Sequence, residues 1–299
     1  MNEFDIFSDM DRFQQERFKE LERIQAEDEQ LRDEEADLKA ETAYLRMRLA
    51  DAYIKEGKHS KAIAEYKKII KIEPQNAMFQ TRLGDAYIII EEYPAALKAL
   101  KKAIELDPKL PDPRSSLADI YMRHGQLLDA NKQYKLAANL ASESAYYQYL
   151  YGESLYKLGK LTEAKRAMKK ASNLSKDVPY YRFRLATIMM LTNDKKSAYR
   201  MLKNVVKLAP YDDYYVVRFA GVAISLGLNK EGGAAIKKAM EIRPHNNAYK
   251  HLYALLFLFN DDRKNYEKLI KQAGKIDEYD RIFINERLKE WGTADKTLD

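Results

Sequence analysis

The chain contains no cysteine, and only 11 of its 299 residues are glycine and 8 are proline. The absence of cysteine excludes disulfide bonds and thiolate metal sites. Few glycines and prolines together with 33% charged residues are typical of helical proteins rather than loop-rich or disordered ones. No apolar run approaches the roughly 18 residues of a membrane-spanning helix, and the start of the chain lacks a signal peptide's apolar segment. We therefore expect a cytoplasmic protein without a membrane span.

The charge of the chain is divided unevenly along its length. Residues 1–42 contain 15 acidic and 6 basic residues, a net charge of −9, whereas the whole chain carries +6 and the remainder therefore +15. Opposite charges in one chain attract each other, or each attracts a partner of the opposite sign. This division sets residues 1–42 apart as an acidic N-terminal segment.

A repeat of 34 residues runs through the rest of the chain. The stretches KKIIKIEP (67–74), KKAIELDP (101–108) and KKAMEIRP (237–244) recur at offsets that are multiples of 34. Seven rows of this length, counted from Ala43 to Asp280, follow one another without a gap. The eighth position of each row is small: Ala50, Gly84, Ala118, Gly152, Ala186, Ala220 and Ala254. The twentieth position is small in six rows, as Ala62, Ala96, Ala130, Ala164, Ala198 and Gly232, and is Tyr266 in the seventh.

Each row has the pattern of two amphipathic helices joined by a turn. Apolar residues recur at helical spacing in both halves of a row. Gly57, Gly125, Gly159 and Gly227 fall between the halves, where a residue with positive φ ends a helix. Proline at the thirty-second position, as in Pro74, stops the second helix. The small residues at the eighth and twentieth positions are expected to let the helices pack closely.

These columns, with a large residue at position 11, an aromatic at 24 and alanine at 27, make the rows resemble the tetratricopeptide repeat. The resemblance implies an all-α fold, a right-handed α-solenoid of about seven helix-turn-helix repeats. Row seven departs from the pattern at Asp261 and Tyr266, as a terminal repeat does. The amphipathic stretch Arg281–Trp291 is expected to cap the last apolar face. The chain is thus divided into an acidic helical arm (1–42), seven repeats (43–280) and a capping helix with tail (281–299).

The arm contains a narrow apolar stripe. Its residues recur every seven positions, at Ile24, Leu31, Leu38 and Leu45. A two-stranded coiled coil needs two apolar seam positions per heptad, and here Asp28 and Glu35 occupy the second one. Three arrangements remain open: a helix packed on its own repeats or on a partner, a homodimeric coiled coil, and a solvated arm.

No residues in the sequence are arranged for catalysis or for holding a cofactor. The histidines His59, His124, His245 and His251 have no metal-ligand spacing. A glycine-rich phosphate loop and a serine nucleophile elbow are also missing. We therefore expect no catalytic residues, no metal, no cofactor and no enzymatic activity.

The first helix of each repeat lines the inner face of a tetratricopeptide stack, and its positions 2, 5 and 9 share one side. In rows four to six this side carries aromatic residues with arginines beside them. Such residues dominate interface energies and predict a groove for a segment of a partner protein, although packing between rows is the alternative. The predicted partner-binding residues are Tyr146, Tyr149, Tyr180, Phe183, Arg184, Tyr214 and Arg218.

The ninth position carries carboxylates in the first four rows. This groove acidic ladder consists of Asp51, Asp85, Asp119 and Glu153. Tetratricopeptide proteins that hold chaperone tails use lysine at position 5 and asparagine at position 9, whereas this chain has Met47 and Thr81 at position 5 of its first two rows. The ladder would repel a carboxylate tail, so we do not expect chaperone-tail binding.

A second ladder consists of lysines at position 25, on the second helices. It contains Lys67, Lys101, Lys135, Lys169, Lys203, Lys237 and Lys271. Such a stripe is either a solvated face or a site for nucleic acid or an anionic surface. Nucleic-acid readers interleave aromatics with their basic residues, and the aromatics here belong to the opposite face, which disfavours nucleic acid.

The sequence thus predicts a non-enzymatic scaffold or adaptor that binds a peptide or helical segment of another protein in its concave groove. The alternatives are binding of nucleic acid or an anionic surface through the lysine ladder, and self-assembly into a homo-oligomer through the arm.

Overall fold

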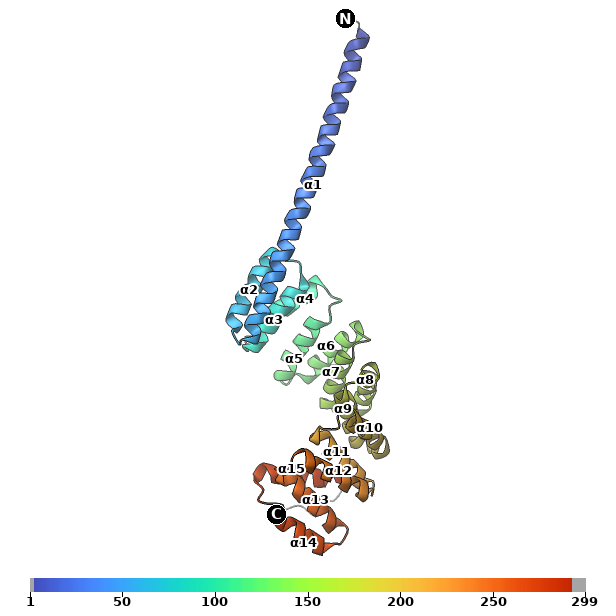
Figure 1. The fold of residues 1–299 in the computed structure, drawn as a ribbon. Coiled ribbons are helices and arrows are strands. Elements are labelled where there is room, and N and C mark those ends of the chain that lie inside the picture. Colours follow the sequence, from blue (N-terminus) through green and yellow to red (C-terminus); the bar gives the residue numbers. More distant parts are fainter. Residues whose placement is uncertain (1–2, 292–299) are drawn as a thin grey trace. The chain divides into compact units, whose positions relative to one another are not determined.

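The computed structural model describes residues 3–291. Residues 1–2 and 292–299 lie outside this description, as do the side chains of residues 3–22, 24–26, 28, 31 and 32. The predicted tail and the apolar stripe at Ile24 and Leu31, with its neighbour Asp28, therefore fall outside the described part. Helices alone, α1 to α15, and no strands make up the regular structure of residues 3–291 (Figure 1).

The chain forms two compact units, residues 1–120 and residues 121–299. The first contains α1 (Glu3–Lys55), α2 (His59–Ile72), α3 (Ala77–Ile89), α4 (Tyr93–Leu106) and most of α5 (Asp112–Arg123). The second contains α6 (Leu127–Leu140), α7 (Ala145–Lys157), α8 (Leu161–Leu174), α9 (Pro179–Leu191), α10 (Lys195–Leu208), α11 (Asp213–Ser225), α12 (Asn229–Ile242), α13 (Asn247–Phe259), α14 (Arg263–Gln272) and α15 (Glu278–Trp291).

The helices follow the 34-residue register of the sequence. Every second helix of a row, from α2 to α14, begins at the seventeenth position of its row. Within the second unit the helices of a row pack on each other, and each second helix packs on the first helix of the next row, as α8 does on α9. This order confirms the predicted all-α fold of helix-turn-helix repeats.

The small columns of the repeat lie where the helices come closest. All seven residues at position 8 are buried, as are the six small residues at position 20. A Cβ atom on Gly84 would lie 2.7 Å from Leu100 Cδ2, and one on Gly232 would lie 2.4 Å from Ile224 Cγ1. These glycines are therefore required by close approach between helices rather than by backbone conformation.

The turn between the two helices has the same backbone conformation in all seven rows. Position 15 has positive φ in every case, with Gly57 at 72°, Gly125 at 72°, Gly159 at 74°, Gly227 at 77°, Glu91 at 61°, Asn193 at 58° and Asp261 at 59°. Only glycine adopts this region without a steric penalty. The turn is therefore a property of the repeat, and in the three rows without glycine at position 15 the backbone is strained there.

The arm and the first repeat helix form a single helix. Helix α1 runs for 53 residues and passes without interruption through residue 42. The side chains from Asp33 to Glu41 are exposed, so this part of the arm is not packed on the repeats. The division of the chain into arm, repeats and cap stays a prediction.

Candidate protein-binding groove

The exposed aromatic residues of the second unit lie on the first helices of rows four, five and six. The second position of each row is a tyrosine that reaches solvent: Tyr146 on α7 is 50% exposed, Tyr180 on α9 41%, and Tyr214 on α11 45%. We call these three residues the tyrosine row. Because they occupy one repeat position, they share the face on which the sequence predicts a partner-binding groove.

Aromatic rings from the preceding row support two members of the tyrosine row, Tyr180 and Tyr214. The Tyr149 ring lies 5.4 Å from the Tyr180 ring in an edge-to-face arrangement. In the next row, the Phe183 ring lies 5.4 Å from the Tyr214 ring in the same arrangement and 5.2 Å from the Tyr215 ring. Aromatic pairs of this geometry contribute about 0.5–1.5 kcal/mol beyond their buried area. From row four to row five and from row five to row six, the residue at the fifth position thus holds the tyrosine at the second position of the next row in place.

Phe183 is buried rather than exposed, with 5% of its surface accessible, and belongs to the core of the second unit. The sequence predicts that it contacts a partner directly. Tyr214 and Tyr215 of the next row cover it, and this packing was the alternative that the sequence left open. Phe183 therefore supports the exposed tyrosine of the next row, and its contact with a partner stays a prediction.

Tyr149 is half-buried and hydrogen-bonded to a member of the tyrosine row. Its hydroxyl lies 3.1 Å from the hydroxyl of Tyr180. Burial, together with this hydrogen bond, raises the pKa of Tyr149 well above its usual value. The Tyr149 phenol therefore stays neutral over the physiological pH range.

Arg184 and Glu153 form a two-pronged ion pair between rows four and five. The Arg184 Nε and Nη2 atoms donate to the two Glu153 carboxylate oxygens, both at 2.7 Å, and the two side chains are only 18% and 19% exposed. The Arg184 guanidinium also lies 5.3 Å from the Tyr156 ring centroid. This ion pair holds the side chains of Arg184 and the ladder residue Glu153 in fixed positions, so that a polar surface lies beside the tyrosine row.

The other predicted arginine is engaged by the C-terminal helix. Arg218 on α11 forms an ion pair with Glu290 of α15 and lies over the Phe183 ring, 5.7 Å from its centroid. This partner could not be predicted, because the two residues are 72 positions apart and the ladder pattern pairs neighbouring rows. The inner face near Arg218 is therefore covered by α15.

The remaining acidic ladder lies in the first unit and is hydrogen-bonded there. Asp51 accepts a hydrogen bond from the Tyr66 hydroxyl at 2.7 Å, and Asp85 accepts one from Ser116 Oγ at 2.6 Å. Burial raises the pKa of the Asp85 carboxyl, which the Ser116 hydrogen bond partly opposes. Asp119 is half-buried on α5. The effect of these carboxylates on a partner stays a prediction.

Aspartates at the starts of α11 and α14 have structural roles. The side chain of Asp212 accepts from the Tyr215 backbone N–H at 3.1 Å and caps α11. Asp262 caps α14 in the same way, through the Asn265 N–H. Asp213 is buried and receives Arg243 Nε at 2.9 Å. Among the described residues, no group of three or more metal-ligating side chains converges on a common point.

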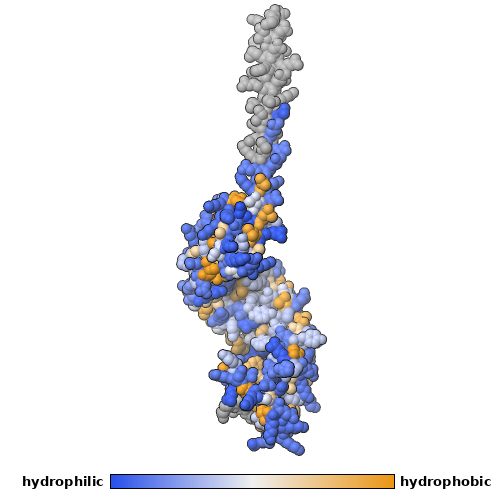
Figure 2. Space-filling model, turned by 60° about the vertical axis from the view of Figure 1, so that its left-hand side comes forward, coloured by the Kyte–Doolittle hydropathy of each residue, from blue (hydrophilic) through white to orange (hydrophobic). Residues whose placement is uncertain are grey.

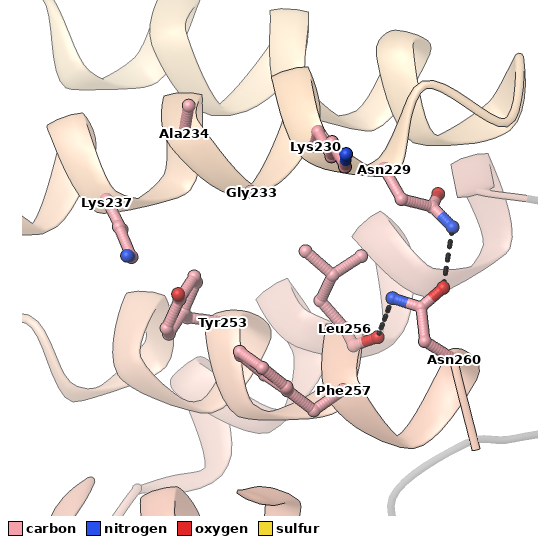
Figure 3. Close-up of a pocket in the computed structure, with 9 residues that line it drawn as sticks. All are labelled: Asn229, Lys230, Gly233, Ala234, Lys237, Tyr253, Leu256, Phe257 and Asn260. Atoms are coloured by element: carbon pink, nitrogen blue, oxygen red, sulfur yellow. Dashed lines mark hydrogen bonds between the residues drawn. The ribbon is translucent and has the colours of Figure 1, made fainter. Parts of the chain in front are cut away.

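The lysine ladder is exposed at all seven positions. One of its members, Lys237, borders an open pocket of about 320 Å³ between α12 and α13 (Figure 3). Tyr253, Leu256 and Phe257 form the apolar wall of the pocket, and Lys237 Nζ lies 5.3 Å from the Tyr253 ring centroid. An Asn229–Asn260 hydrogen bond of 2.7 Å crosses one end. Two other members of the ladder also lie over tyrosine rings, Lys67 over Tyr87 at 5.7 Å and Lys203 over Tyr199 at 5.5 Å from the ring centroid. Aromatic rings are therefore present beside the ladder as well, and binding of nucleic acid or an anionic surface there stays an alternative.

Comparison with known families gives one match. The model of the family described as "Cilia and flagella-associated protein 70 C-terminal domain", a tetratricopeptide-repeat domain, matches residues 21–215. A search of curated proteins gives no match. The matched range covers α2 to α10 in full together with parts of α1 and α11.

Several solved structures resemble this fold. The C-terminal part of a TPR repeat-containing protein from Cytophaga hutchinsonii has a TM-score of 0.63 at 18% identity, covering 78% of this chain and 97% of its own. A tetratricopeptide repeat protein from Parabacteroides merdae has a TM-score of 0.54 at 17% identity, covering 84% and 99%. YrrB, described as a TPR protein with an unusual peptide-binding site, has a TM-score of 0.53 at 17% identity, covering 66% and 97%. At these identities the likeness shows the fold alone. In the described part of this chain, no helix has the length and apolar character to cross a membrane.

Proposed function

Because the chain belongs to the tetratricopeptide-repeat family described as the C-terminal domain of cilia and flagella-associated protein 70, we propose that it is a scaffold that binds a segment of another protein. Tetratricopeptide repeats are typically interaction folds rather than enzymes. The proposed binding surface is the inner face of α7, α9 and α11 in the second unit. Partner identity is not implied by the fold, since one fold serves many functions.

The observation that carries this proposal is the exposure of the tyrosine row. Three tyrosines in three successive rows keep between 41% and 50% of their surface in solvent on one face. Tyrosine supplies a large apolar contact and a hydrogen-bonding hydroxyl at low conformational cost, and it is enriched among interface residues that dominate binding energy. The Tyr149 and Phe183 rings hold Tyr180 and Tyr214 in place before a partner arrives, which lowers the entropic cost of binding.

The proposed partner is a peptide or helical segment rather than a small molecule. The tyrosine row follows three parallel helices, so its contacts are distributed along a line and suit an extended or helical segment. The name of the matched family makes a protein of cilia or flagella the first partner to examine. A cytoplasmic location stays a prediction of the sequence.

The test compares two triple variants of the full chain with the wild type. One replaces the tyrosine row by serine, and the matched control replaces the exposed lysines Lys135, Lys169 and Lys237 by serine. Each protein is used to capture partners from host extract, and each captured candidate is then purified and titrated against all three proteins. Circular dichroism checks that both variants keep the helical content of the wild type.

We expect a partner whose affinity falls at least tenfold with the tyrosine variant and is unchanged with the lysine variant. Equal affinity for all three proteins would contradict the groove assignment. Loss with the lysine variant alone, together with steep salt dependence, would favour the anionic-ligand alternative.

Exposed leucines on α1 favour a second candidate function, self-assembly through the arm. Leu38 is 64% exposed, Leu45 56% and Leu49 42%, and Figure 2 shows hydrophobic surface where α1 meets the other helices of the first unit. Leu38 and Leu45 are one heptad apart, as in a coiled-coil seam. We propose that these leucines contact another copy of α1.

Light scattering across a concentration series tests this second function. A dimer that Leu38→Glu/Leu45→Glu dissociates, while Asp33→Lys/Asp37→Lys leaves it intact, would support it. A wild-type mass equal to one chain at every concentration would reject it.

A further inference from the structure

Helix α15 does not continue the succession of the repeats. In rows four to six, each second helix packs on the first helix of the row that follows. Helix α15 instead packs on α11 and α13, the first helices of rows six and seven (Figure 1). First helices line the inner face of the fold, so the position of α15 raises the question of which face it covers.

The contacts of α15 identify the covered face as the inner one. Glu290 binds Arg218, which follows the fifth position of row six, and Trp291 lies against Gly221 at the ninth position. In row seven the inner positions are buried, with Ala248 at the second position 2% exposed and Leu255 at the ninth also 2% exposed. The second position is a half-exposed tyrosine in the three preceding rows. Helix α15 therefore covers the part of the inner face that follows the tyrosine row.

The residues of α15 are spaced like those of a helix bound in a groove. Ile284 and Leu288 are fully buried and Trp291 is 4% exposed, which gives anchors at i, i+4 and i+7. This is the spacing by which amphipathic helices dock in protein grooves. The opposite side of α15 faces solvent, with Tyr279 83% and Ile282 52% exposed.

The seat of Trp291 depends on a glycine that breaks the pattern of its column. A Cβ atom on Gly221 would lie 2.9 Å from Trp291 Nε1 and 3.2 Å from Cδ1, closer than packed side chains allow. The Phe259 ring completes the seat, 5.8 Å from the indole and edge-on to it. Row six therefore has no side chain at the ninth position, and the indole occupies the space.

We propose that the inner face of α11 and α13 is a helix-binding surface, that α15 occupies it as an internal ligand, and that the partner segment is an amphipathic helix that takes the place of α15. Such a helix carries two aliphatic residues and an aromatic residue at i, i+4 and i+7, with a carboxylate beside the aromatic for Arg218. This inference rests on the proposed function and names the kind of segment that the groove accepts. The connection between α14 and α15 spans residues 273–277, so α15 competes with the partner at the high effective concentration of a tethered ligand.

The experiment uses the full chain and a fluorescein-labelled peptide of residues 278–291. An opened variant, Ile284→Ala/Leu288→Ala, removes two anchors from α15 and keeps Trp291, the only tryptophan in the sequence. The matched control, Tyr279→Ala/Ile282→Ala, changes the exposed side of the same helix. Acrylamide quenching of Trp291 fluorescence reports whether α15 has left the face, and fluorescence anisotropy reports peptide binding.

We expect the opened variant to show strong quenching and to bind the peptide at least tenfold more tightly than the wild type or the control. Adding Gly221→Leu to the opened variant should abolish that binding, because the substitution fills the indole seat. A scrambled peptide should not bind.

The inference is overturned if Trp291 becomes accessible while the peptide binds the opened variant no better than it binds the wild type. Amide hydrogen exchange shows whether α11 and α13 unfold locally in the opened variant. If the peptide protects the amides of these two helices from exchange, the inference is supported. If the two helices unfold and the peptide does not protect them, α15 is a purely structural cap and the inference is rejected. None of these substitutions changes the tyrosine row. Failure here therefore leaves the proposed function standing, whereas equal partner affinity in the tyrosine variant would reject that function separately.

Discussion

Truncation of two neighbouring aromatic residues on α9 should affect stability and partner affinity in opposite order. Phe183 and Tyr180 both belong to the predicted partner-binding set, but Phe183 is 5% exposed and Tyr180 41% exposed. Phe183→Ala removes a buried ring and its two aromatic contacts and leaves a cavity, which costs about 3–5 kcal/mol. Tyr180→Ala removes a ring that is largely in solvent and should cost about 1 kcal/mol.

The predicted difference is large enough to measure directly. For a unit of this size, 1 kcal/mol shifts the melting temperature by about 2–4 °C, so Phe183→Ala should lower it by roughly 6–20 °C and Tyr180→Ala by only a few degrees. Guanidinium unfolding followed through Trp291 fluorescence gives the free energies, because Trp291 belongs to the same unit as both residues. The partner's affinity should show the reverse order, with Tyr180→Ala weakening binding by about tenfold or more.

Phe183→Leu is the matched control, because it keeps most of the buried volume and should recover much of the lost stability. The account of the groove is refuted if Phe183→Ala costs less than about 1 kcal/mol, or if Tyr180→Ala costs as much as Phe183→Ala. Either result would mean that Phe183 is not a buried supporting ring while Tyr180 is an exposed contact residue.

Three further predictions concern the stability of the first unit, measured by thermal and guanidinium unfolding. Glu91→Gly should raise stability by up to about 1 kcal/mol, because Glu91 has φ of 61°; a loss would show that Glu91 makes a compensating contact. Gly84→Ala should lower stability by roughly 1–3 kcal/mol, because the added Cβ would lie 2.7 Å from the fully buried Leu100; a gain from helix propensity alone would contradict the close packing. Burial raises the pKa of the Asp85 carboxyl, although the hydrogen bond from Ser116 partly opposes this. The folded state therefore binds the carboxyl proton more tightly than the unfolded chain does, and the free energy of unfolding falls as pH rises from the unfolded pKa through the folded pKa. Asp85→Asn should therefore be more stable than wild type at pH 7 and lose that advantage near pH 3, below the unfolded pKa of about 4; an advantage that does not change with pH would refute the assignment.

The repeat and its turns could be predicted from the sequence because they depend on local rules. A 34-residue period, small residues at two positions and glycine at position 15 fix where helices start, approach and turn. The family pattern even extends to rows without glycine, since Glu91, Asn193 and Asp261 adopt the same positive φ. Helix placement in such a fold needs only contacts between neighbouring rows.

The division of the aromatic cluster into exposed and buried members could not be predicted in the same way. Positions 2 and 5 share one helical face, so spacing alone assigns Tyr180 and Phe183 the same environment. Their burial differs because Tyr214 and Tyr215, 31 and 32 residues further on, cover one ring and not the other. Phe183 packs between rows, as one of the two alternatives describes.

The location of α15 also lay beyond sequence reasoning. An amphipathic stretch after the last repeat predicts a cap, but amphipathicity does not say which apolar face it covers. The glycine at position 221 was a usable signal, because it replaces the side chain expected in its column. Its meaning depends on Trp291, 70 residues later, and no local rule connects the two. The same holds for Arg218, whose partner Glu290 lies on that helix.

The most direct test of the central claim places a photo-crosslinker in the groove of the full chain. Benzoylphenylalanine replaces Tyr180 in one protein and the exposed Lys169 in a control, and both are irradiated with the purified partner. The account predicts crosslinks from position 180 to a single helical or extended segment of the partner, and none from position 169. Crosslinks from position 169 with none from position 180 would place the partner on the outer helices and contradict the account.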